Sequence, residues 1–313
     1  MSHPAPSTAA ISRILVPLDG SDTALAALAY ATTFPGASLI LLQVSLDLTT
    51  LLPEVSPNEI DEVDTELRAD LERIAAPLRE AGIAVETLVE DGDPADRIVT
   101  VAEREGADII VMTTRGRGAA GRLLFGSVAD RVSRHATLPT VLVRIGGDAG
   151  PEAPSRILVT LDGSRRAEAA LPVAERFASS LGAPMVLFRA VTLEDTLRTA
   201  SRIQGTLGGR ALETTDEAFT AAREETERQA QAYLDGLAAG LAGEVSTLVL
   251  HGTPAASLLQ EIGPSDLTIV TSHGASGVTR WLLGSVAEKL VREAAGPVCL
   301  VPARAEAGPS GQA

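Results

Sequence analysis

Two glycine-rich loops are the stretches of this sequence whose residue types and spacing point to chemistry. In the first loop, Gly116 and Gly126 are separated by nine residues and Ser127 follows; Gly274 and Gly284 repeat this spacing in the second, where Ser285 follows. Glycine lets the backbone approach a ligand closely, and successive N–H groups form a cradle for phosphate oxygens. Each loop lies between an apolar strand-like run and a segment with the apolar spacing of a helix, whose N-terminal end also favours an anion.

An alternative interpretation is structural. Gly-Ser before an amphipathic helix is also an ordinary N-cap. Two copies in one chain, each after a strand of similar composition, favour anion binding over this alternative. Neither Ser127 nor Ser285 has a base nearby in the sequence, so no catalytic residue is expected. The four histidines and the single cysteine show no metal-ligand spacing, so no metal-ligating residue is expected either.

Two aspartates occupy matching positions ahead of these loops. Asp19 and Asp162 each follow an apolar run and begin an Asp-Gly-Ser sequence. Such a turn can simply cap the next helix, or the carboxylate can hydrogen-bond an adenine or ribose group. The repeated placement at the end of a strand favours the ligand role, because ligands of parallel α/β sheets bind beyond the carboxyl ends of the strands. Arg115, Arg117 and Arg122 could meet phosphates or form a solvated basic edge.

The elements that must position these residues occur twice along the chain. In each half, apolar runs alternate with helix-like segments, which predicts a parallel sheet covered by helices on both faces. We expect domains at 1–147 and 154–303, joined by a Gly/Pro linker, and a disordered tail at 304–313. The second half has a longer segment at about 192–217, before a polar helix. The expected strands are 13–21, 38–44, 84–89, 108–113 and 140–144 in the first half, and 156–164, 184–191, 266–271 and 298–301 in the second.

Composition limits the partners and the compartment. The net charge of −15 argues against a nucleic acid or an anionic membrane as partner. The single cysteine, Cys299, excludes an intrachain disulfide and fits a reducing compartment. No signal peptide and no apolar run of transmembrane length are apparent, so a cytoplasmic location is expected.

Nearly the whole chain, 11–144 and 155–302, resembles the universal stress protein family in its tandem two-domain form. ATP-binding members of this family carry Gly-x2-Gly-x9-Gly-Ser/Thr, and the last two glycines and the serine match in both halves. The first glycine of the motif is replaced by Thr113 and Thr271. The resemblance implies two doubly wound domains, each a five-stranded parallel sheet with strand order 3-2-1-4-5. Strands one and four of each half are then neighbours.

The resemblance also implies an ATP site in each half, with magnesium on the phosphates. Asp19 and Asp162 correspond to the family's strand-one aspartate, and Val44 and Ala190 to the second-strand residue whose backbone contacts adenine. The expected binding residues are Pro17, Asp19, Val44, Thr113, Gly116, Arg117, Gly126, Ser127 and Val128, followed in the second half by Thr160, Asp162, Ala190, Thr271, Gly274, Gly284, Ser285 and Val286.

Three functions remain open from the sequence. The first is a stress-response or regulatory protein that binds ATP with little or no turnover. The second is a slow ATPase or autophosphorylating enzyme, and the third is an interaction module that has lost nucleotide binding. We also expect the two fifth strands, 141–143 and 298–301, to pack against each other as an intrachain pseudo-dimer, since each would otherwise be an open sheet edge. A homodimer of whole chains is compatible with this arrangement.

Overall fold

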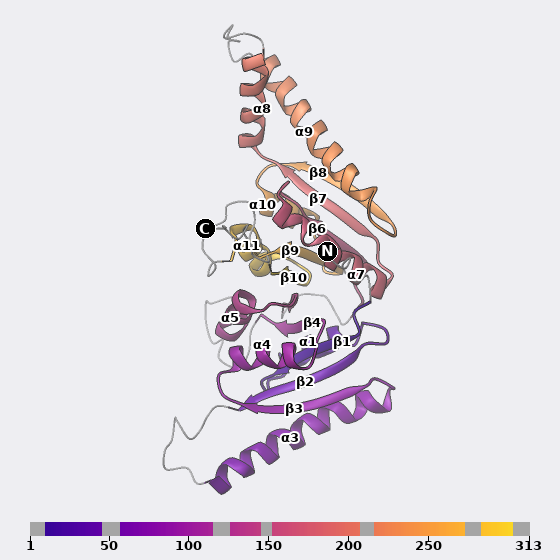
Figure 1. The fold of residues 1–313 in the computed structure, drawn as a ribbon, viewed down its shortest axis with the longest axis vertical. Coiled ribbons are helices and arrows are strands. Elements are labelled where there is room, and N and C mark those ends of the chain that lie inside the picture. Colours follow the sequence, from indigo (N-terminus) through magenta and orange to yellow (C-terminus); the bar gives the residue numbers. More distant parts are fainter. Residues whose placement is uncertain are drawn as a thin grey trace, which may run out of the picture.

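The computed structural model describes residues 10–45, 57–114, 126–144, 152–206, 216–272 and 283–302 (Figure 1). Helices and strands alternate along both halves of the chain, as the apolar runs predict. The elements of the first half are β1 (Arg13–Leu18), α1 (Leu25–Ala31), β2 (Ser38–Ser45), α3 (Pro57–Glu80), β3 (Val85–Asp91), α4 (Pro94–Arg104), β4 (Ile109–Thr113), α5 (Ser127–His135) and β5 (Thr140–Val143).

The second half repeats this order with additional helices. Its elements are β6 (Arg156–Thr160), α6 (Arg165–Glu168), α7 (Leu171–Leu181), β7 (Met185–Val191), α8 (Leu193–Thr206), α9 (Asp216–Ala238), β8 (Val245–His251), α10 (Pro254–Glu261), β9 (Asp266–Thr271), α11 (Ser285–Glu293) and β10 (Val298–Val301).

The strands of the described residues form one ten-stranded sheet in the order β3-β2-β1-β4-β5-β10-β9-β6-β7-β8. Each half therefore has the expected order 3-2-1-4-5, and its strands are parallel. The halves meet where β5 and β10 pair antiparallel, with Val141 opposite Cys299. This pairing confirms the predicted contact between the two fifth strands and removes two open edges from the molecule.

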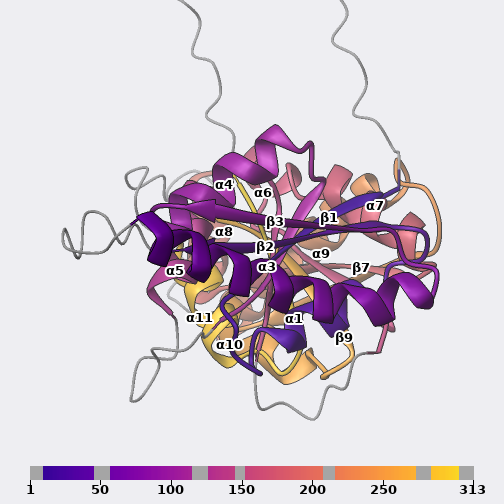
Figure 2. The same cartoon turned by 90° about the horizontal axis from the view of Figure 1, so that it is seen from below.

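Two apolar layers cover the sheet, because successive side chains of a buried strand point to opposite faces. Helices α1, α3, α7 and α9 pack on one face, and α4, α5, α10 and α11 pack on the other. Figure 2 shows α4 and α1 on opposite sides of the strands of the first half. Each layer contains buried residues of both halves, so the core continues across the junction.

The junction is also polar and aromatic. Arg176 of α7 forms an ion pair with Asp108, which precedes β4, and the Ile11 N–H donates to Ser180 Oγ at 2.7 Å. The rings of Phe34 and Phe177 meet edge to face, with 5.7 Å between their centroids. Cys299 is buried here, and burial raises the pKa of its thiol well above the ordinary value.

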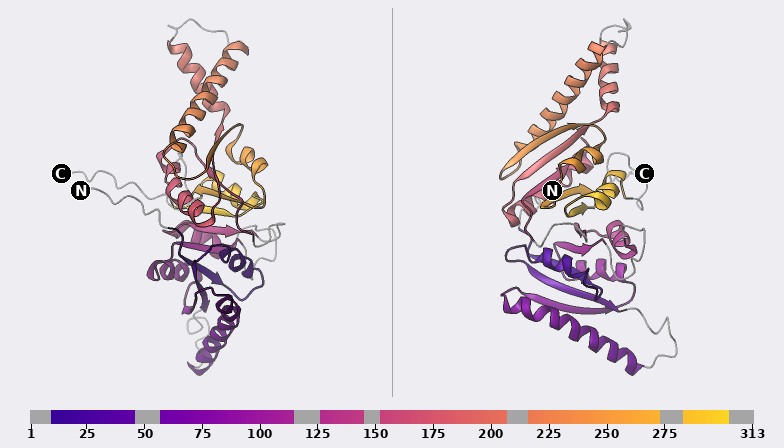
Figure 3. Two further views of the ribbon diagram at one scale, coloured as in Figure 1. Left: turned by 90° about the vertical axis from the view of Figure 1, so that its right-hand side faces the viewer. Right: turned by 180° about the vertical axis from the view of Figure 1, so that it is seen from behind.

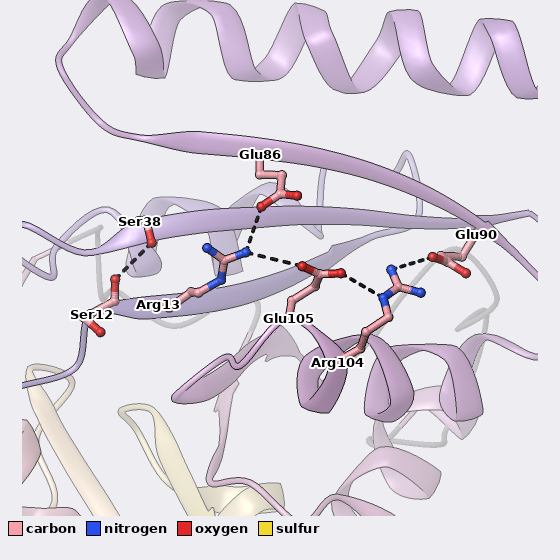
Figure 4. A network of polar contacts seen from close by, with 7 residues as sticks. All are labelled: Ser12, Arg13, Ser38, Glu86, Glu90, Arg104 and Glu105. Carbon is pink, nitrogen blue, oxygen red and sulfur yellow. Dashed lines mark hydrogen bonds and ion pairs between the residues drawn. The ribbon is translucent and has the colours of Figure 1, made fainter. Parts of the chain in front are cut away.

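Asp108 is available to Arg176 because of a difference between the halves. In the second half, Arg156 binds the counterpart aspartate, Asp266, through two hydrogen bonds of 2.8 and 2.9 Å. In the first half, Arg13 instead binds Glu86 at 2.8 Å, within the network of carboxylates and arginines shown in Figure 4. The aspartate at the start of β4 can therefore join the two halves.

Helices α8 and α9 extend beyond the sheet as a pair (Figure 3). Buried small residues on both helices, including Thr196, Thr199 and Ala222, let them pack closely. From the sequence, we expected a segment here that is longer than its counterpart in the first half, but we did not predict helix α8. Its start carries a recognisable signal, because the Thr192 N–H donates to the Asp195 carboxylate at 3.0 Å and the Asp195 N–H donates back to Thr192 Oγ1 at 3.2 Å. This reciprocal arrangement is a capping box.

Candidate functional site

The start of α5 is fixed to the end of β4. Gly126 is the N-cap residue, and its N–H donates to the carbonyl oxygen of Thr114 at 2.7 Å. The second half repeats this contact, with the Gly284 N–H donating to the Ser272 carbonyl at 2.8 Å. The Thr114 N–H donates to the Val143 carbonyl oxygen at 3.1 Å, which extends the pairing of β4 with β5. Each helix therefore begins at a defined place beside the carboxyl end of its strand.

Among the described residues, no side chain accepts a hydrogen bond from the first amides of α5 or α11. The backbone at Gly126 and Gly284 is extended, and both caps lack a side-chain hydrogen bond. The first bonds within the helices are donated by Asp130 and Glu288, so the amides of the preceding three residues face out of the helix end. Ser127 is the first helical residue rather than the cap. An ordinary helix start, with Gly126 or Gly284 as the N-cap, therefore fits this geometry, and the amides of the first turn also suit an anion.

The uncapped helix ends lie where the strand order reverses. From β1 the chain proceeds outward through β2 to β3, whereas β4 leads to β5 on the other side. β1 and β4 are direct neighbours, with Leu15 opposite Ile110, and β6 and β9 pair in the same way, with Val159 opposite Ile269. Ligands of open α/β sheets bind at this reversal, beyond the carboxyl ends of the strands.

The two aspartates at this edge are part of tight turns. The Ser21 N–H donates to Asp19 Oδ1 at 3.1 Å, and the Ser164 N–H donates to Asp162 Oδ1 at 2.9 Å. Ser164 Oγ in turn accepts from the Ala167 N–H and caps α6. Each turn needs a glycine at its centre, since Gly20 and Gly163 have φ of 74° and 85°. The structure therefore shows the turn-forming role of the aspartates, and their contact with a ligand stays a prediction.

The described residues of the predicted site gather at this edge in matching positions. Pro17 lies opposite Leu42 and Thr160 opposite Phe188, so the first two strands of both halves share one register. The predicted residues at the ends of these strands and at the helix starts are Pro17, Asp19, Val44, Thr113, Gly126, Ser127 and Val128, with Thr160, Asp162, Ala190, Thr271, Gly284, Ser285 and Val286 in the second half. Gly116, Arg117 and Gly274 lie outside the described residues.

A charged corner between α4 and α5, formed by Asp93, Asp96 and Arg131, was not predicted from the sequence. Arg131 reaches from α5 to the start of α4, where it binds Asp93 at 2.6 Å and Asp96 at 3.0 Å. Asp93 is the N-cap of α4 and accepts from the Ala95 and Asp96 N–H groups. The hydrogen bond from Arg131 is the main cause that lowers the pKa of Asp93, and burial opposes it. An aspartate directly before a proline indicates the start of α4, but it gives no signal of the ion pair with Arg131.

Fold and site together define a tandem α/β protein with an uncapped helix end at the strand-order reversal of each half. Sequence comparison gives the family: residues 10–144 and 154–302 match the model of the universal stress protein family. The chain belongs to this family. Its two matching segments correspond to the two halves of the sheet.

Individual relatives agree with this assignment. A universal stress protein of Mycolicibacterium smegmatis is 27% identical over 229 residues, covering 71% of this chain and 70% of the relative. One from Mycobacterium tuberculosis strain H37Rv is 30% identical over 201 residues, covering 61% of each. The crystal structure of a universal stress protein from Archaeoglobus fulgidus matches 93% of this chain and 98% of its own, with a TM-score of 0.64 and 21% identity, which supports the fold.

Two further features are absent from the described part of the chain. No cluster of three or more His, Cys, Asp or Glu side chains suitable for a metal ion occurs among them. None of the helices within the described ranges has the length and hydropathy needed to cross a membrane.

Proposed function

We propose that this chain is a cytoplasmic stress-response or regulatory protein that binds Mg-ATP at the carboxyl edge of each half, with little or no turnover. The observation that carries the proposal is the pair of helices, α5 and α11, that begin uncapped beside the strand-order reversal. Their amides suit phosphate oxygens, because the helix N-terminus supplies both hydrogen-bond donors and partial positive charge. We assign one site to each domain, 1–147 and 154–303.

The proposed roles follow the position of each residue along the edge. The amides of Ser127 and Val128, and of Ser285 and Val286, would hold phosphates. The backbone of Val44 or Ala190 and the carboxylates of Asp19 and Asp162 would meet the nucleoside. We also propose Pro17, Thr160, Thr113 and Thr271 as lining residues, and Gly116, Arg117 and Gly274 as parts of the phosphate loops.

Magnesium in this proposal is carried by the nucleotide. Mg²⁺ commonly binds through phosphate oxygens and water with few protein ligands. The described residues fit this mode, since they hold no cluster of acidic side chains that would form a dedicated metal site. The cation relieves repulsion between the triphosphate and a chain of net charge −15.

Nucleotide stoichiometry tests the proposal. The purified protein is denatured and examined by mass spectrometry for bound nucleotide, and ATP is then titrated by calorimetry with millimolar magnesium. We expect two ATP per chain, one for Gly126→Val and one for Gly284→Val. Both glycines have negative φ, −71° and −60°, so valine adds bulk at the phosphate position without the backbone strain that a left-handed glycine would bring. Gly236→Ala, in α9, is the control.

The expected loss in each variant is several kcal/mol, because charge-assisted hydrogen bonds are each worth roughly 1.5–3 kcal/mol. Wild type that takes up no ATP would refute the proposed function. A wild-type value near one would limit it to a single half, identified by the variant that leaves binding unchanged. ATP hydrolysis well above the rate without protein would replace a binding protein by a slow ATPase.

A further inference from the structure

The two halves differ in charge at one corner of the proposed site. In the first half, Arg131 lies four residues after Ser127, on the same stripe of α5. Its guanidinium is held by Asp93 and Asp96 at the start of α4. Arg131 is therefore neutralised within the protein, and its donors are directed at α4 rather than at the end of α5.

The second half keeps the cation and lacks both carboxylates. Lys289 lies four residues after Ser285, so it is the counterpart of Arg131, and it is the only lysine of the chain. The counterparts of Asp93 and Asp96 are Thr253 and Ala256, neither of which can be ionised. The Thr253 side chain makes no capping hydrogen bond to α10. The two positions that hold Arg131 in the first half thus carry no carboxylate in the second.

Lys289 has no hydrogen-bond or ion-pair partner in the part of the chain that the structure describes. The adjacent carboxylate, Glu288, lies 3.8 Å from Arg292 instead. The lysine is half-buried, so its stem is packed against the protein while the amine can reach solvent. The Lys289 ammonium group therefore forms no ion pair within the described residues and is available to a ligand.

The direction of the side chain determines what the amine can reach. Side chains on an α-helix point toward its N-terminus and cover the turn that precedes their own Cα. This general direction brings the Lys289 amine within reach of the first turn of α11, which begins at the Gly284 N-cap. An ammonium group and helix amides at one place attract the same ligand chemistry, an anion with several oxygens.

We propose that Lys289 donates to a phosphate oxygen of the nucleotide in the second half, a role that Arg131 does not take in the first. This inference rests on the proposed function and adds to it that the two sites recognise phosphate differently. The contribution of Lys289 depends on the phosphates, so it is present for ATP and absent for adenosine.

The single lysine allows a direct test. In Gly126→Val, which leaves only the second site, reductive methylation with ¹³C-formaldehyde labels Lys289 and the N-terminal amine alone. We expect ATP to shift the lysine resonance and adenosine to leave it in place. ATP bound according to calorimetry without a shift of this resonance would overturn the inference while leaving the proposed function intact. No ATP bound to this variant would overturn the inference and would limit the proposed function to the first half, whereas wild type that binds no ATP would overturn both.

Affinities provide the second measurement. In the Gly126→Val background, Lys289→Met should weaken ATP binding about tenfold or more, as expected for a lost charge-assisted hydrogen bond, and Lys289→Arg should restore it. Adenosine affinity should stay constant. A parallel loss for adenosine would mean that Lys289 only supports the structure, and would overturn the inference.

Transferring the carboxylates between halves gives a matched control. Thr253→Asp places the first half's acid beside Lys289 and should weaken ATP binding with the lysine still present. Arg131→Met in the Gly284→Val background should leave ATP affinity at the first site within about twofold of its parent. A large loss in this control together with none in Lys289→Met would reverse the assignment and overturn the inference.

Discussion

Gly296 shows how tightly single residues are fitted near the junction. A Cβ at this position would lie 2.3 Å from the carbonyl oxygen of Asp266, 2.9 Å from that of Gly263 and 3.0 Å from that of Pro264. All three atoms belong to the backbone, so no rotamer change can relieve the contact. Close approach, rather than backbone angle, is what requires glycine here.

We predict that Gly296→Ala destabilises the protein by about 2 kcal/mol or more, because overpacking a rigid site forces backbone movement. Urea unfolding followed by circular dichroism measures the change. Gly236→Ala is the matched substitution, since a Cβ there meets nothing within 4 Å and the residue lies inside α9. It should stabilise by about 0.5–1 kcal/mol through helix propensity. Equal effects of the two substitutions would contradict this assignment.

Site residues whose interactions are local in the sequence could be predicted, and those with partners far along the chain could not. Gly126, Gly284 and the two aspartates could be found from the sequence, because their roles depend on local order along the chain and repeat in both halves. The ion pair between Arg131 and Asp93 joins residues 38 apart, and no local pattern specifies it. Whether a basic side chain is available to a ligand depends on such distant partners. The sequence alone could therefore not show that Arg131 is paired and Lys289 is not.

The formation of helix α8 depends on the residues at its N-terminal end. It leaves the sheet directly after β7, and Leu193 and Leu197 on its surface are exposed. Tertiary burial therefore contributes little at this end, and the capping box of Thr192 and Asp195 fixes the first turn.

We predict that Asp195→Ala raises amide exchange across the first turns of α8, since loss of a helix cap costs about 1 kcal/mol and local stability is low at an extended element. Hydrogen exchange read by mass spectrometry on peptides from 193–206 gives the measurement. Peptides from β6 and β9 should keep their protection. If the protection of α8 were unchanged, the capping box would not control its formation.

The central strands were predicted, whereas the edge strand β8 and helix α8 were not, for a physical reason. Central strands of a parallel sheet are buried on both faces, so runs such as Ile109–Thr113 are apolar without interruption. The buried residues of α8 include Thr196 and Thr199, so the face that packs against α9 looks polar in the sequence. The strand order could be expected only from the family resemblance, because periodicity does not show which strands are neighbours.

Asp108 is a charged group that joins the two halves, through its ion pair with Arg176. Burial alone would raise the pKa of Asp108, but hydrogen bonds from the Ser12 and Arg13 amides, the Ser12 hydroxyl and Arg176 lower it. A carboxyl group whose pKa is lower in the folded state stabilises that state above its unfolded pKa of about 4, and this stabilisation is lost as pH falls through the folded pKa.

We therefore predict that Asp108→Asn lowers the free energy of unfolding by roughly 2 kcal/mol at neutral pH and by less in acid. Urea unfolding of both proteins between about pH 6 and about pH 2.5 should show the difference shrinking below the unfolded pKa. Asp70→Asn is a suitable control, because Asp70 forms only an exposed pair with Arg73. A difference that stays constant with pH would exclude the carboxylate as its source.

Because both apolar layers cross the junction, we predict that the two halves unfold together. Cys299 reports on this directly, as the single thiol of the chain and a buried residue of β10. Its reaction with a thiol reagent should follow the same urea transition as the circular dichroism signal. Thiol exposure at lower urea than the loss of helix signal would show instead that the β5–β10 contact opens first.

The pairing of β5 with β10 inside one chain has a consequence for how the molecule can diverge. When identical subunits assemble, every substitution appears twice, once on each side of the symmetry axis. Here the two copies are separate stretches of one gene product and can drift independently. Among the described residues, the helix pair α8–α9 and the unpaired Lys289 occur in the second half alone. The two ends of the molecule therefore differ, and a ligand that recognised either feature would bind once per chain and in one orientation.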